Sequence, residues 1–159
     1  QWNHTFWRNG TLKGIRKFDE FIKDNTVKKQ SIDKSRAEFL IKEAENGYNY
    51  LIEMIQKIKL NDNNANNFVK SCYDILMELI RAKMLLEGYN ASGNRAHEAE
   101  VSYMRVLGFG EKDVQFADQM RFFRNGMLYY GTILDKIYAE KAIGFTKNIY
   151  PKLRQMLNK

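Results

Sequence analysis

The chain has 159 residues, with one proline, one cysteine, 44% hydrophobic residues and a net charge of +7. This length suffices for one well-buried core and is short for two domains. A single cysteine excludes an intramolecular disulfide framework. One proline, the high hydrophobic content and long stretches without turn chemistry argue against a β-rich fold and predict an all-α protein. No apolar run approaches the ~20 residues that span a bilayer, so we expect a cytoplasmic protein without membrane contact.

The positive charge is concentrated at the two ends of the chain. Residues 1–30 carry seven basic and three acidic side chains, and residues 139–159 carry five basic and one acidic. The stretch between them is close to neutral. Basic ends fit binding to a polyanion such as RNA or to an acidic partner. On charge alone, a basic surface that only aids solubility is an equally good interpretation.

The chain divides into an N-terminal basic and aromatic extension, residues 1–30, and a helical bundle, residues 31–159. We expect a short helix near residues 14–24. Apolar residues at helical spacing predict a long helix over residues 33–60. Asp33 and Ser35 are its candidate N-caps, and Ser35 has capping-box form with Glu38. The run of Asn and Asp residues at 61–67 should end this helix and form a mobile hairpin tip.

A second helix follows from the apolar residues between Phe68 and Leu86 and should end at Gly88. The first two long helices should pack antiparallel. Residues 89–94 are expected to form a loop, in which Ser92 or Asn94 caps a third helix.

A fourth helix should open at Asp113 and end near Gly131. Thr132 and Asp135 resemble a capping arrangement for a last helix, which Pro151 should kink or end. Together these elements predict an antiparallel up-and-down helical bundle of four to five helices.

The segment Arg121-Phe-Phe-Arg-Asn-Gly-Met-Leu-Tyr-Tyr-Gly131 places several polar side chains in an otherwise apolar helix. Such groups need partners when buried. Asn125 and Tyr129 share one helical face, whereas Arg124 and Tyr129 are ~140° apart in a straight helix. Arg124 and Tyr129 can meet only if the helix is interrupted, and Gly126 and Gly131 make an interruption plausible.

Two interpretations of this segment stay open. In the functional one, Arg121 and Arg124 bind phosphate, Asn125 orients it, and Tyr129 and Tyr130 stack on a base or hydrogen-bond the backbone. In the structural one, the same groups form a buried hydrogen-bond network that locks the helix to its neighbours.

Arg124 and Asn125, followed by Tyr129, resemble the Arg-Asn-x-x-x-His signature of the HEPN superfamily, with a tyrosine at the histidine position. A second similarity lies in Tyr89-Asn-Ala-Ser-Gly-Asn-Arg-Ala-His-Glu-Ala-Glu100, which looks like the tyrosine, small polar loop and His-Glu pair of some prokaryotic members. The resemblance covers most of the chain after the first 30 residues. It implies a helical bundle around two long antiparallel helices, with the motif in a late helix.

Many HEPN proteins are metal-independent endoribonucleases that act as symmetric dimers. In that chemistry the histidine activates the ribose 2′-hydroxyl and the arginine stabilises charge on the phosphate. Carried over, the catalytic positions are Arg124, Asn125 and Tyr129, but a phenol with a pKa of ~10 is a poor base at neutral pH. His97 is the alternative base, although a histidine that bonds a loop carbonyl is the favoured interpretation. No metal site and no cofactor are expected.

The sequence therefore predicts a homodimeric, HEPN-like protein that binds RNA or a nucleotide, cleaves RNA very slowly or not at all, and could belong to a toxin-antitoxin or defence pair. The dimer should use the fourth helix, which carries Phe122 and Phe123 on different faces. One alternative is a non-catalytic interaction module that partners a nucleotidyltransferase or an antitoxin. The other is a metal-independent endoribonuclease that uses Arg124 with a non-standard base.

Overall fold

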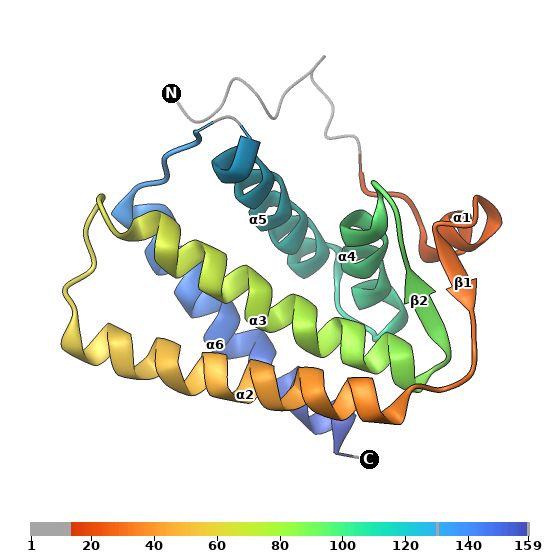
Figure 1. Ribbon diagram of the computed structural model, residues 1–159. Helices are drawn as coiled ribbons and strands as arrows, with labels where there is room; N and C mark the ends of the chain where they lie inside the picture. Colours follow the sequence, from red (N-terminus) through yellow and green to blue (C-terminus); the bar gives the residue numbers. More distant parts are fainter. Residues whose placement is uncertain (1–13, 130, 159) are drawn as a thin grey trace.

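The structure is a computed structural model that describes residues 14–129 and 131–158, except for the side chains of residues 128 and 129. Within these residues it contains six helices and two short strands (Figure 1). In chain order they are α1 (Phe18–Lys23), β1 (Val27–Lys29), α2 (Lys34–Lys57), α3 (Ala65–Leu86), β2 (Tyr89–Ala91), α4 (Ala96–Val106), α5 (Glu111–Tyr129) and α6 (Lys136–Leu157). The predicted helical bundle is confirmed: helices α2 to α6 make up its five helices, and α1 is the short helix expected near residues 14–24. No helix of the described part is long and apolar enough to cross a membrane.

Helix α3 is the centre of the bundle. It runs antiparallel to α2, as predicted, and Figure 1 shows α2 and α6 on one side of it and α4 and α5 on the other. More than half of its 22 residues are buried, and the single cysteine, Cys72, is among them. By contrast, α2 buries only Ala37, Ala44 and Leu51. Helix α3 therefore carries most of the apolar surface that holds the other helices.

The turn between α2 and α3 differs from the mobile tip expected from its composition. The Asn61 and Asn64 side chains accept hydrogen bonds from backbone amides within the turn. Farther along, Asn66 donates to the carbonyl of Thr132 at 2.9 Å and accepts from the amide of Leu134 at 2.8 Å. These bonds hold the start of α3 against the segment between α5 and α6. The polar side chains of this region therefore form hydrogen bonds within the protein.

The two strands were not predicted, because residues 89–94 were expected to form only a loop. Strand β1 pairs antiparallel with β2, and Val27 lies opposite Ala91. Gly88 ends α3 with a φ of 79°, which confirms its predicted role after the helix. A Cβ at this position would lie 2.8 Å from the carbonyl oxygen of Gln30, so glycine is required here both by conformation and by space.

The helix ends agree with the sequence in part. The Asp33 side chain caps α2 by accepting from the amide of Arg36, as predicted. At α6 the cap is Asp135, which accepts from the amide of Tyr138, and not Thr132, three residues earlier. Neither Ser92 nor Asn94 caps α4, whose N-cap residue is Arg95. Pro151, expected to kink or end the last helix, does not end it, because α6 continues through it to Leu157. Burial of α6 residues on both sides of the proline offsets the lost backbone hydrogen bond.

Residues 14–30, the described part of the N-terminal extension, pack on the bundle. Phe18, Phe21 and Val27 are buried in the main core. Arg105 of α4 donates to the carbonyl oxygens of Ile15 and Arg16, both at 2.8 Å. This part of the extension therefore shares its core with the helices that follow.

Candidate functional site

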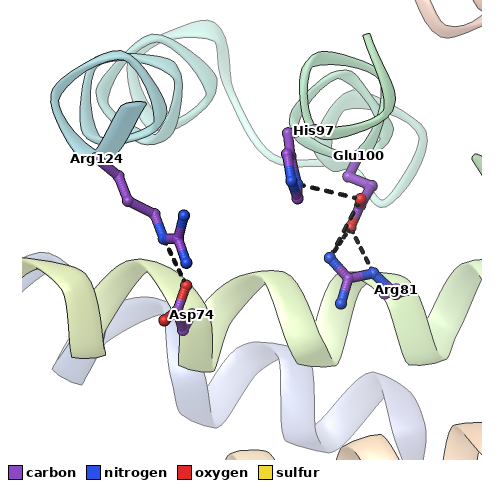
Figure 2. A network of polar contacts seen from close by, with 5 residues as sticks. All are labelled: Asp74, Arg81, His97, Glu100 and Arg124. Carbon is purple, nitrogen blue, oxygen red and sulfur yellow. Dashed lines mark hydrogen bonds and ion pairs between the residues drawn. The ribbon is translucent and has the colours of Figure 1, made fainter. Parts of the chain in front are cut away.

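Arg124 lies at the boundary between α5 and α3. Its Nε donates to Oδ1 of Asp74 at 2.8 Å, and Figure 2 shows the side chain reaching from α5 to α3. The guanidinium carbon lies 5.7 Å from the centroid of the Tyr73 ring. The Arg124 side chain is 25% exposed and that of Asp74 is 46% exposed. The guanidinium is thus positioned by α3 and still reached by solvent.

Arg121 lies one helical turn before Arg124. Its Nε donates to Oδ1 of Asp118 on the same helix at 2.7 Å, and both side chains are about one-fifth exposed. Both arginines act electrostatically on Tyr73, where they partly oppose the effect of burial, which raises the pKa of the phenol well above its usual value. Both arginines are therefore close enough to Tyr73 on α3 to act on its charge.

A second polar group lies beside the first on α3. The carboxylate of Glu100 on α4 is only 3% exposed and accepts from Nε of Arg81 at 2.9 Å and from a terminal nitrogen of Arg81 at 3.2 Å. Nδ1 of His97 lies 3.5 Å from Oε1 of the same carboxylate. We expected His97 to bond a loop carbonyl, but its polar neighbour is Glu100. The two residues are one turn apart on α4, so the helix itself brings them together.

Tyr73 joins the two groups. The ring of His97 lies 6.5 Å from the Tyr73 ring, centroid to centroid, and the Arg124 guanidinium contacts the same ring. The Tyr73 hydroxyl is buried and has no hydrogen-bond partner among the described residues. The structure therefore brings Arg124 and His97, predicted from separate segments, to one tyrosine that sequence reasoning had counted only as part of the second helix.

Helix α5 passes without interruption through the residues of the motif. An interruption was plausible at Gly126 or Gly131; α5 continues through Gly126 and ends at residue 129, close to the end predicted near Gly131. Gly126 instead makes room for the next segment: a Cβ there would collide with the side chain of Thr132, whose amide donates to the Gly126 carbonyl. The half-buried Asn125 lies next to Arg124 on α5. The side chain of Tyr129 and all of Tyr130 lie outside the described residues.

Asp74 and Arg81 are the partners that the sequence analysis missed. Both lie on the partly exposed stripe of α3, which also contains Glu78. Charged residues at four- and three-residue spacing in an otherwise apolar helix were the available signal. Their partners on α4 and α5 could not be found without the crossing of the helices.

Glu78 has the most perturbed carboxylate of this stripe. Its partial burial raises the pKa to about 7, and the negative charges of Asp74 and Glu43 add to the effect, while Arg81 opposes it. Ionising Glu78 is therefore unfavourable in the folded protein. Because the folded-state pKa lies above the ordinary value of 4.5, folding stability should fall as the pH rises from about 4.5 to about 7.

Replacing Glu78 with glutamine should raise the free energy of unfolding by about 1 kcal/mol at pH about 8, after allowance for solvent screening at this partly exposed site. Below pH about 4.5 both side chains are neutral, so the gain should vanish. Urea unfolding at the two pH values measures the difference. Glu38→Gln, at an exposed position of α2, is the matched control. An equal gain at both pH values would contradict the assigned cause.

The chain was compared with known proteins in three ways. No protein-family model, no curated protein and no solved structure matches it. Among the described residues, no group of three or more His, Cys, Asp or Glu side chains could hold a metal ion. The resemblance to the HEPN superfamily thus rests on Arg124, Asn125 and Tyr129 and on the segment 89–100.

Proposed function

We propose that this chain binds RNA or a nucleotide through a phosphate group at Arg124. The observation that carries the proposal is the way Arg124 is held: Asp74 takes the Nε hydrogen, and no other described side chain is hydrogen-bonded to the guanidinium. The terminal NH2 groups of a guanidinium fixed in this way match the two oxygens of a phosphate. One-quarter exposure of the side chain gives a ligand access.

Nearby charges limit the strength of such a site. Asp74 and Asp118 each pair with one of the arginines of α5, so the site is not a cluster of unpaired cations. The positive charge at the two ends of the chain would add a longer-range attraction for a polyanion. We therefore expect modest affinity that depends strongly on salt.

RNA cleavage should be absent or very slow. The position of the family histidine is Tyr129, and a phenol is a weak base at neutral pH. His97 is the only histidine among the described residues, and its side chain is about half exposed. Were cleavage to occur, His97 would be the base, because it contacts the same tyrosine as Arg124.

The test is a fluorescence-anisotropy titration of the full chain with a short labelled single-stranded RNA, repeated over a series of salt concentrations. Binding should weaken steeply as salt rises, because counterions are released from the bound phosphates. The same RNA, incubated with the protein and a metal chelator, should remain intact on a gel. Absence of binding at low salt would refute the proposal. Robust cleavage that survives the chelator would favour the endoribonuclease alternative.

A further inference from the structure

Helix α2 exposes large apolar side chains on the outside of the bundle. Phe39 is 63% exposed and Tyr50 is 60% exposed. They lie about three helical turns apart and so share one face of α2. The buried residues of α2 face α3 and the core instead. Figure 1 shows α2 at the edge of the bundle, so this outer flank has no neighbouring helix among the described residues.

Exposed residues recur along this flank at alternating spacings of three and four. We call the following six residues, all exposed, the α2 stripe: Arg36, Phe39, Glu43, Asn46, Tyr50 and Glu53. An alternation of three and four is the pattern of a seam between two packed helices. The α2 stripe therefore has the form of a helix-docking surface that the described part of the chain leaves uncovered.

The outer residues of the α2 stripe are complementary to those of a second stripe that runs antiparallel to it. Phe39 and Tyr50 lie equally far from the midpoint of the stripe, and so do Arg36 and Glu53. An antiparallel second copy would therefore set Phe39 against Tyr50 of its partner, which buries both rings. It would also set Arg36 against Glu53 of its partner, and thus a positive charge against a negative one.

The central residues of the α2 stripe obey the same symmetry. Glu43 would lie opposite Asn46 of the second copy, and an amide can donate to a carboxylate. A parallel copy would instead place Glu43 against Glu43 and Arg36 against Arg36, which is unfavourable. The sequence of the stripe thus selects the antiparallel arrangement.

The charged members are available for such contacts. Arg36 and Glu43 form no ion pair with a described residue, and Glu53 pairs only with Lys57, one turn farther along α2. Exposed ion pairs of this kind contribute little to stability. Glu53 can therefore leave Lys57 for a residue of a second copy at little cost in free energy.

We propose that two copies of this chain associate through the α2 stripe, with the two α2 helices antiparallel about a two-fold axis. A two-fold contact requires a surface that is complementary to itself, and the three kinds of pair described above meet this requirement. The proposal is independent of the Arg124 site. It differs from the dimer through the fourth helix that the sequence predicted, so the two surfaces can be tested against each other.

The first test is light scattering of the full chain at micromolar concentration, which should return the mass of a dimer. Phe39→Asp together with Tyr50→Asp should return the mass of a monomer, because four charges would then lie within the seam. Ile133→Asp is the matched control, at a side chain that is 74% exposed between α5 and α6, and it should remain a dimer. Circular dichroism should give the same helix content for all three proteins.

The second test is a charge exchange that depends on the antiparallel register. Arg36→Glu alone sets two negative charges opposite each other at both ends of the seam and should raise the dimer dissociation constant roughly tenfold. Adding Glu53→Arg restores opposite charges across the axis, so the dissociation constant should return close to that of the parent. Both changes suit the helix dipole, because the acid lies in the first turn of α2 and the base lies near its end.

Three results would overturn the proposal. The first is a monomeric parent chain at micromolar concentration. The second is a dimer that persists in the Phe39 and Tyr50 variant; its additional loss with Ile133→Asp would place the interface between α5 and α6. The third is a charge exchange that fails to restore the dimer, which would exclude Arg36 and Glu53 as partners across the axis.

Discussion

Replacing Arg81 with methionine should lower the free energy of unfolding by about 3 kcal/mol at neutral pH. The cause is the carboxylate of Glu100, which is 3% exposed and receives two hydrogen bonds from Arg81. Methionine keeps most of the volume of the arginine stem but leaves the buried charge with only the half-exposed His97 beside it. Chemical denaturation of the parent and variant proteins gives the difference.

A double variant separates the lost pair from lost packing. Adding Glu100→Gln to Arg81→Met removes the buried charge itself, so part of the stability should return. Arg95→Met is the matched control, because that side chain is 59% exposed and lies 3.9 Å from its acidic neighbour; it should change stability by less than ~0.5 kcal/mol. A loss below ~1 kcal/mol in Arg81→Met would show that the Arg81 and Glu100 pair does not hold α3 to α4.

Replacing Arg124 with alanine should weaken RNA binding by about 1–3 kcal/mol, the range for hydrogen bonds to a charged group. This corresponds to a loss of roughly 5-fold to 150-fold in affinity. The fold should survive, because Asp74 is 46% exposed and becomes solvated when its partner is removed. Anisotropy titrations at one fixed salt concentration compare the two proteins.

Two further variants make this result specific. Lys42→Ala removes the same positive charge from α2, on the other side of α3, where the side chain is 68% exposed, and it should leave affinity nearly unchanged. Asp74→Asn removes the negative charge beside Arg124 and should strengthen binding if a phosphate occupies the site. Equal affinities for the parent and a folded Arg124→Ala protein would assign Arg124 to a purely structural contact with α3.

The helices could be predicted because their signals are local. Apolar periodicity, the capping side chain of Asp33 and the glycine after α3 depend only on neighbouring residues. Strands β1 and β2 could not be predicted in this way. They pair residues about sixty positions apart, and three-residue strands carry too little pattern to be distinguished from a loop.

Within the candidate site, the motif residues could be identified from the sequence, but their contact partners could not. Arg124 stood out because a charged residue occurs in an apolar helix, but its contact with Asp74 exists only where α5 crosses α3. The neighbouring pair of His97 and Glu100 is local to α4, yet its link to Arg81 is not. Pro151 does not end α6 for a related reason, since tertiary packing of the helix outweighs the local preference of proline.

The central claim is that a phosphate binds at the Arg124 guanidinium, and side-chain NMR tests it most directly. The Nε–H signals of the arginines are followed while a short single-stranded RNA is added to the full chain. The account predicts that the Arg124 signal shifts in a saturable way. The signal of Arg105, whose guanidinium already bonds Glu111 and two carbonyl oxygens, should stay in place. Saturable binding that leaves the Arg124 signal unmoved would contradict the claim.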